Sequence, residues 1–165
     1  MNWKARYKES YEAFQDVEYP AASSTYGYLK VKEYPDVTKH NGLRKFATDF
    51  LKWNGHHAEV TGNTGRKIFD KKKQKEIWIN GSGTNGTSDV KCDIAVDFQR
   101  SPVPVKIEIK VGRDFQSDAQ IEYEADVTTN GALYWLIRSP ERLIDLYDNL
   151  LQGWDQYDAF ILSLK

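Results

Sequence analysis

Two nearby segments alternate between apolar and mostly charged residues, and this pattern constrains the fold more than any other feature of the chain. Every second residue from Val90 to Val96 and from Val105 to Val111 is apolar. Side chains alternate between the two faces of a β-strand with this period. Pro102 and Pro104 mark a turn between the segments. The pattern therefore predicts an antiparallel hairpin with one apolar face and one polar face.

The rest of the chain supplies helices and further short strands. Apolar residues recur at three- and four-residue steps from Leu43 to Leu51, which predicts an amphipathic helix. Further helices are predicted over residues 2–16, 117–129 and 140–153, and further strands over residues 57–61, 77–79, 132–138 and 159–164. This order is typical of an α/β fold with one mixed sheet flanked by helices. Residues 1–37 are interpreted as an N-terminal extension, and residues 38–165 as the domain itself.

Composition excludes several classes of protein. A chain of 165 residues with 40% hydrophobic residues is long enough to bury a core, and one compact domain is expected. The longest apolar run, from Ala132 to Ile137, is too short to span a bilayer, and no signal peptide opens the chain. A lone cysteine, Cys92, excludes an intrachain disulfide framework and a Cys-rich zinc module. We therefore expect a reducing, cytoplasmic environment.

Three charged residues on the polar face of the predicted hairpin are candidates for a catalytic site. Glu108 and Lys110 are two residues apart on one strand, so they share a face. Asp89 stands at the start of the neighbouring strand, where pairing would bring its carboxylate near Glu108. Two converging carboxylates suit a hard divalent cation such as Mg²⁺. The alternative is a solvated strand face carrying an ordinary charge pair, which is common on protein surfaces.

Three sequence motifs resemble a known nuclease superfamily. They are Gly86–Val90, Ile107–Lys110 and Ser117–Gln120. In this order, and with the predicted succession of helix, three strands, helix and strand, they are similar to the signature of the PD-(D/E)XK nucleases. The nearest branch is the VRR-NUC type, which is related to Holliday-junction resolvases and common in phages and bacteria. The resemblance covers roughly residues 38–140 and implies a restriction-endonuclease-like αβββαβ core.

The resemblance implies a role for each matching residue. Asp89 and Glu108 would bind Mg²⁺ or Mn²⁺, together with the main-chain carbonyl of Ile109. Lys110 would be the catalytic lysine, and Gln120 would face the site from the following helix. Gln120 has a second interpretation, because Ser117-x-x-Gln120 is also a capping box.

The chain also departs from the pattern of the family. Ser88 replaces the proline that often precedes the first acid. Relatives often carry a glutamate near the position of Asn41, on the first helix of the domain, but this chain has none there, and Asp49 is an acid later on the same helix. Asp93 and Asp97 share the polar face with Asp89 and are rival ligands. His40, His56 and His57 flank the first helix and are interpreted as ordinary surface and edge residues.

A basic segment is the candidate contact with nucleic acid. It is expected to be a loop, it runs from Arg66 to Lys75, and it contains a single acid, Asp70. Its basic residues are Arg66, Lys67, Lys71, Lys72, Lys73 and Lys75. Such a local cluster suits a phosphate backbone even though the whole chain has a net charge of −1. Arg113, just beyond the Glu108 strand, is a second candidate contact, and a solubilising surface loop is the alternative interpretation of the basic segment.

These features predict a metal-dependent deoxyribonuclease, either an endonuclease or a junction-resolving nuclease that hydrolyses phosphodiester bonds. The resemblance to nucleases also implies a role in DNA repair or recombination and a cytoplasmic location in a bacterial or phage-infected cell. Resolvase-like relatives are often dimers, which implies a homodimer. The alternative is a catalytically inactive module on the same fold that binds nucleic acid or protein.

Overall fold

The computed structural model describes residues 2–31, 33–61, 66–70, 72–79, 86–96 and 101–163. Within these residues the chain forms an α/β structure whose centre is a four-stranded mixed sheet of order β1-β4-β5-β6. Its strands are β1 (His57–Val60), β4 (Val90–Ile94), β5 (Val103–Ile109) and β6 (Leu133–Ile137). β4 is antiparallel to both β1 and β5, and β5 is parallel to β6. The predicted antiparallel hairpin and the mixed sheet are thus confirmed.

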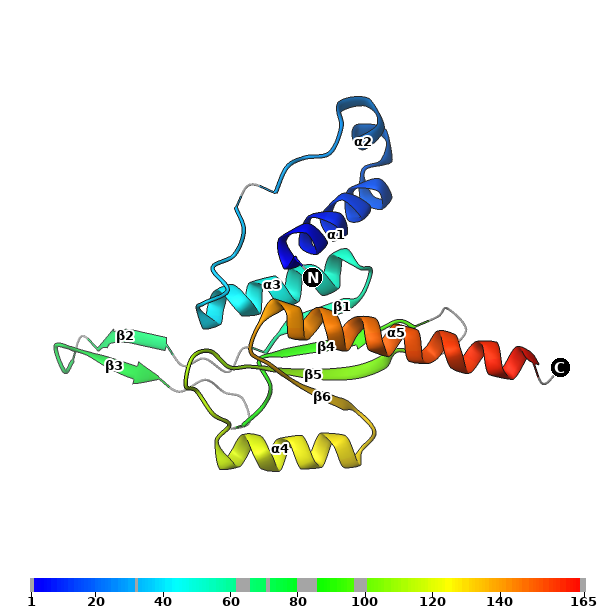
Figure 1. Cartoon of the computed structure of the whole chain (residues 1–165). Coiled ribbons are helices and arrows are strands. Elements are labelled where there is room, and N and C mark those ends of the chain that lie inside the picture. The colour runs from blue at the N-terminus through cyan, green and yellow to red at the C-terminus, as the bar shows by residue number, and fades with distance from the viewer. Residues whose placement is uncertain are drawn as a thin grey trace.

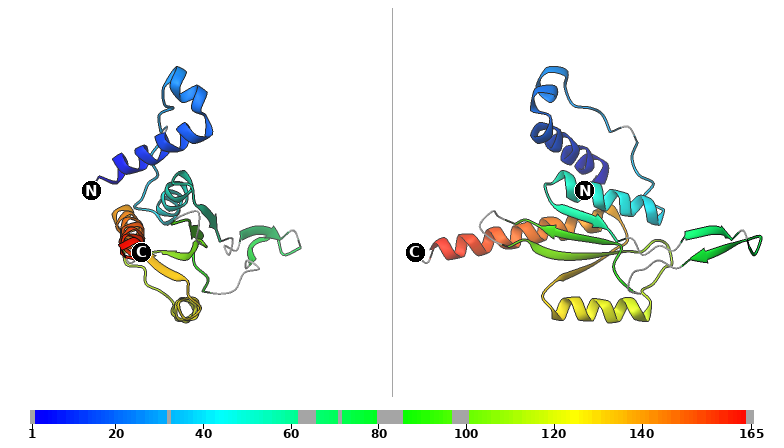
Figure 2. Two further views of the ribbon diagram at one scale, coloured as in Figure 1. Left: turned by 90° about the vertical axis from the view of Figure 1, so that its right-hand side faces the viewer. Right: turned by 180° about the vertical axis from the view of Figure 1, so that it is seen from behind.

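Helices cover the two faces of this sheet in different ways (Figures 1 and 2). The helices α3 (His40–Trp53) and α5 (Pro140–Ser163) lie over one face, and α4 (Asp118–Thr129) lies over the other. Leu43 and Phe50 of α3 and Ile144 of α5 belong to one core with Val90 of β4 and Ile107 of β5, and all five are fully buried. By contrast, no residue of α4 is buried. The hydrophobic core therefore lies under α3 and α5, and α4 covers the polar face.

Two helices precede the predicted domain. The first, α1 (Trp3–Glu18), packs on α3, and the second is the short α2 (Pro20–Tyr26). Tyr7 of α1 is 1% exposed, stacks on Phe46 with 5.3 Å between ring centroids, and belongs to the same core as the sheet. Helix α1 therefore adds to the main core, although the domain boundary near residue 38 stays a prediction.

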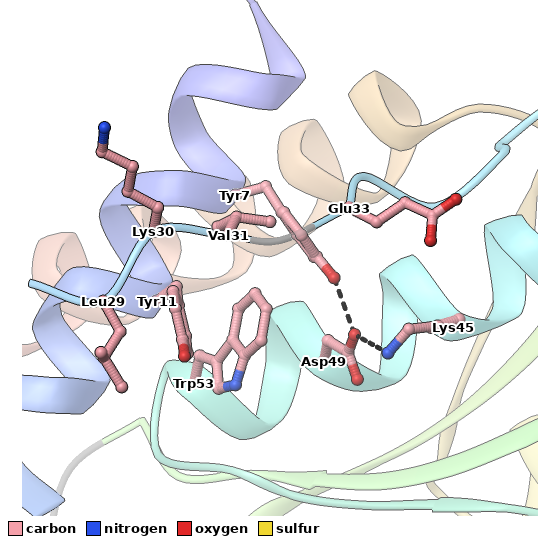
Figure 3. A pocket seen from close by; sticks show the side chains of 9 residues that line it. All are labelled: Tyr7, Tyr11, Leu29, Lys30, Val31, Glu33, Lys45, Asp49 and Trp53. Carbon is pink, nitrogen blue, oxygen red and sulfur yellow. Dashed lines mark hydrogen bonds and ion pairs between the residues drawn. The ribbon is translucent and has the colours of Figure 1, made fainter.

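A groove of about 700 Å³ opens where α1 meets α3 (Figure 3). At its floor the Tyr7 hydroxyl donates a hydrogen bond of 2.7 Å to Oδ2 of Asp49, and Lys45 Nζ donates to the same oxygen at 2.7 Å. Burial and the Asp49 carboxylate raise the pKa of Tyr7, so the phenol keeps its proton. Asp49, the later acid of the first predicted helix, thus fastens α1 to α3.

Two of the predictions about secondary structure are wrong. Residues 159–163 are not a strand, because α5 continues through Gly153 to Ser163. A helix tolerates one glycine at a cost of about 1 kcal/mol, and a short apolar run does not by itself distinguish strand from helix. The basic segment is also not a loop, since β2 (Arg66–Asp70) and β3 (Lys75–Ile79) form a hairpin of their own. Its β-branched and aromatic residues favour strands, a signal that the charge run obscured.

None of the helices in the described ranges has both the length and the hydropathy of a membrane span.

The hydrogen bond between Tyr7 and Asp49 can be tested by removing one oxygen atom. We expect Tyr7→Phe to lower the free energy of unfolding by about 2 kcal/mol, because the variant cannot make this partly buried hydrogen bond to a charged group. Urea unfolding followed by tryptophan fluorescence measures this change. Tyr28→Phe is the matched control, since the Tyr28 hydroxyl donates to Asp16 at 2.8 Å in an exposed position. Equal destabilisation of the two variants would contradict the structural role of Tyr7.

Candidate active site

The pairing of β4 with β5 brings Asp89 level with Glu108. Val90 is opposite Ile107, so the residue before Val90 meets the residue after Ile107. Oδ2 of Asp89 accepts a hydrogen bond of 2.9 Å from the main-chain N–H of Ile109. The Asp89 side chain, which is 20% exposed, is thereby held against the end of β5. The position of Asp89 in the sequence predicted that it would approach β5, and the structure shows this approach.

Glu108 and Lys110 are buried rather than solvated. Glu108 is 2% exposed and Lys110 is 5% exposed. Lys110 Nζ lies 3.0 Å from Oε1 of Glu108, so the two form an ion pair with almost no contact with water. The alternative of a solvated strand face is therefore wrong for these two residues. The physical reason is that α4 covers the polar face of β5.

Gln120 connects this ion pair to the first turn of α4. Its Oε1 accepts hydrogen bonds from Lys110 Nζ at 2.9 Å and from the Ser117 main-chain N–H at 3.0 Å, and its Nε2 donates to Oε1 of Glu108. The same side chain therefore completes the capping box of α4 and contacts both members of the ion pair. The two interpretations of Gln120 are compatible.

A glycine allows the segment that carries Asp89 to lie directly against α4. Gly86 has φ of +84°, a conformation that L-residues with side chains rarely adopt. A Cβ atom at this position would lie 2.2 Å from the main-chain oxygen of Ala119, in the first turn of α4. A side chain at residue 86 would therefore push apart the two elements that hold Asp89 and Gln120.

The electrostatics of the cluster are dominated by the burial of Glu108. Burial raises the pKa of Glu108 to about 6, and the negative charge of Asp89 raises it as well, while the hydrogen bond and charge of Lys110 and the charge of His40 lower it. Because this pKa lies above the value of 4.5 for a free glutamate, the group adds stability at low pH. That contribution, about 2 kcal/mol, disappears as the pH rises from 4.5 to about 6.

One oxygen of this carboxyl group has no partner. Oε1 of Glu108 contacts Lys110 and Gln120, but Oε2 is buried and accepts no hydrogen bond in the described part of the chain. A buried acceptor without a partner is costly, and such atoms need an explanation. A cation bound at Oε2 would supply one.

His40 is a member of the site that the sequence did not reveal. Its Nε2 lies 3.2 Å from Oδ2 of Asp89, at the first residue of α3. His56 was also assigned wrongly, because it is 9% exposed and contacts the Tyr147 hydroxyl at 2.9 Å. His57 is on the surface as predicted. The helix start near residue 40 was visible in the sequence, but no local pattern indicated that it would face Asp89.

The remaining candidates lie outside the buried cluster. Asp93 is 54% exposed and lies near His57, and Asp97 lies outside the described residues. Arg113 is exposed on the segment that joins β5 to α4. The basic residues of the hairpin are distributed as follows: Arg66 and Lys67 are on β2, Lys72, Lys73 and Lys75 are exposed, and Lys71 lies outside the described residues. The structure thus brings together Asp89, Glu108, Lys110 and Gln120, and adds His40.

Comparison of the chain with family models, curated proteins and solved structures found no match. In the ranges that the structure describes, no group of three or more His, Cys, Asp or Glu side chains is arranged to hold a metal ion.

The electrostatic arrangement predicts opposite effects of two neutralising substitutions. We expect Asp89→Asn to lower the pKa of Glu108 and Lys110→Met to raise it above about 6, because the Asp89 charge disfavours the carboxylate and the Lys110 charge favours it. Carbon-13 NMR of the glutamate carboxyl groups, recorded without divalent cations, measures both shifts. Asp93→Asn is the control and should leave the titration unchanged. Shifts of the same sign would show that these charges do not act on Glu108.

Proposed function

We propose that this chain is a metal-dependent deoxyribonuclease that hydrolyses phosphodiester bonds on a PD-(D/E)XK-type, restriction-endonuclease-like core. One observation carries the proposal: a buried Glu108–Lys110 pair, bridged by Gln120, lies beside Asp89 at one end of the sheet. These are the residues that the sequence resemblance assigns to catalysis. A buried ion pair is expensive to maintain for stability alone, which favours a functional role.

The donor atoms at this site fit a hard divalent cation. Asp89 and Glu108 would hold Mg²⁺ or Mn²⁺ together with the main-chain carbonyl of Ile109, and the unpartnered Oε2 of Glu108 is an available ligand atom. A magnesium ion usually keeps several waters and takes one or two carboxylates, so a larger side-chain set is unnecessary. When bound, such an ion polarises a phosphoryl oxygen and lowers the pKa of a coordinated water.

Lys110 and Gln120 have complementary tasks in this proposal. The Lys110 ammonium group is fixed by Glu108 and Gln120, so its positive charge has a set position before substrate binds. A fixed cation next to a phosphate stabilises the charge that develops as the P–O bond breaks. Gln120 orients both partners through its two functional atoms. His40 holds Asp89 from the opposite helix.

The β2–β3 hairpin is the proposed DNA contact. It extends from the same side of the molecule on which α3 and α4 begin, and the candidate site lies at these helix starts (Figure 1). Within the described residues β2 and β3 pair with each other in a separate two-stranded sheet. Exposed lysines on such an arm, with Arg113 nearer the site, are suited to phosphate contacts along a substrate.

The central test is cleavage of plasmid and branched DNA with Mg²⁺ or Mn²⁺. We expect Lys110→Met and Asp89→Asn each to reduce the cleavage rate at least about a hundredfold. The first removes the cation that stabilises charge on the reacting phosphate, and the second removes a carboxylate ligand of the metal ion. Lys106→Met on β5 and Asp93→Asn on β4 are the matched controls and should cleave as the parent does. A chelator should abolish cleavage by the parent protein.

The outcome also separates this function from its alternative. Cleavage by both site variants at the parental rate would contradict the proposal. DNA binding by the parent without any metal-dependent cleavage would instead support the catalytically inactive module.

The hairpin makes a separate prediction about salt dependence. We expect the double substitution of Lys72 and Lys73 by Gln to reduce the slope of log K against log salt concentration by about one for each phosphate that the variant no longer neutralises. Fluorescence anisotropy with labelled duplex DNA, in Ca²⁺ to prevent cleavage, measures the slope. Replacing Lys30 and Lys52 by Gln should leave the slope unchanged, because these two lysines are exposed outside the hairpin. An unchanged slope in the hairpin variant would remove the hairpin from the DNA interface.

A further inference from the structure

An exposed aromatic ring lies on the segment between the two catalytic elements. Phe115 follows β5, which carries Glu108, and precedes α4, which carries Gln120. It is 75% exposed, which is unusual for a phenylalanine. Its hydrophobic surface therefore makes little contribution to the core and is available to a ligand.

Arg138 is fixed next to this ring. The Arg138 guanidinium carbon lies 5.6 Å from the centroid of Phe115, and Nη2 donates a hydrogen bond of 2.8 Å to the main-chain oxygen of Asp114. Asp114 also approaches the buried cluster, since its Oδ2 lies 3.6 Å from Lys110 Nζ. A continuous chain of neighbouring groups thus leads from Lys110 through Asp114 to Phe115 and Arg138. The ring and the guanidinium stand at the rim of the candidate site.

A hollow of about 570 Å³ adjoins Arg138. It lies beside β6 and α5, and its charged lining residues are Arg138, Arg142 and one acid, Glu124. Both arginines are exposed. A volume of this size accommodates a small ligand, and two guanidinium groups at its edge favour an anionic one such as a phosphate.

We propose, on the basis of the proposed function, that Phe115 and Arg138 bind an unpaired nucleotide of the DNA substrate next to the cleavage site. The base stacks on the Phe115 ring, and the phosphate lies against Arg138. A base inside a duplex is already stacked on its neighbours, so an exposed ring gains most from a base that lacks a pairing partner. The site therefore selects DNA that has a single-stranded arm, fork or gap over continuous duplex.

The test uses a DNA fork whose first unpaired base is 2-aminopurine, with Ca²⁺ in place of Mg²⁺, and continuous duplex as the comparison. We expect Phe115→Leu to weaken binding to the fork about tenfold and to leave binding to duplex nearly unchanged, because the base can no longer stack on an aromatic ring. The quenching of 2-aminopurine fluorescence should disappear as well. Phe115→Trp should retain both, and Tyr26→Leu, which alters an aromatic residue 87% exposed on α2, should behave as the parent.

The outcomes distinguish this inference from the proposed nuclease function. If Phe115→Leu binds and quenches the fork as the parent does, or if its affinities for fork and duplex fall equally, the stacking site is wrong, while metal-dependent cleavage by the parent still supports the nuclease. If the parent binds neither DNA and cleaves neither with Mg²⁺, both proposals fail.

Discussion

The ion pair between Glu108 and Lys110 lies beneath α4, where water scarcely reaches it. Removing two charges from water costs several kcal/mol for each ion unless hydrogen bonds compensate. Gln120 provides that compensation with both atoms of its amide group, since one accepts from Lys110 and the other donates to Glu108. The position of α4 and the ionised state of the pair therefore depend on each other. Without the Gln120 amide, covering the polar face of β5 with α4 would bury these two charges with fewer hydrogen bonds to compensate them.

The two faces of the sheet have different roles in the fold. Leu43 and Phe50 from α3, with Ile144 from α5, build the apolar core on one face, and α4 contributes no buried residue to it. The other face is then available for charged residues. β4 and β5 have one face on the apolar core and the other on the charged cluster. The packing of the core therefore fixes the positions of Asp89 and Glu108. Sites on strands of this kind are held more precisely than sites on loops.

Local alternation allowed the central part of this arrangement to be predicted from the sequence. The period-two pattern gave the hairpin, and the hairpin register brought Asp89 beside the end of β5. Burial of Lys110 was not predictable, because it depends on α4 folding back over the strand. The approach of His40 to Asp89 joins residues 49 positions apart, and nothing in either local sequence encodes it. Two predictions failed because one feature was given too much weight. The charges of the basic segment suggested a loop where β2 and β3 form, and Gly153 suggested a helix end where α5 continues.

The unpartnered oxygen of Glu108 connects stability with the proposed chemistry. Below a pH of about 6 the carboxyl group carries a proton, which relieves both its burial and its repulsion from Asp89. Above this pH it becomes an anion whose Oε2 lacks a partner, and the folded protein becomes less stable as a result. A divalent cation at Oε2 would do what the proton does at low pH, and at neutral pH it would meet little competition from protons. If the chain has the proposed function, the free-energy cost of leaving this buried carboxylate oxygen without a partner therefore favours binding of the metal ion.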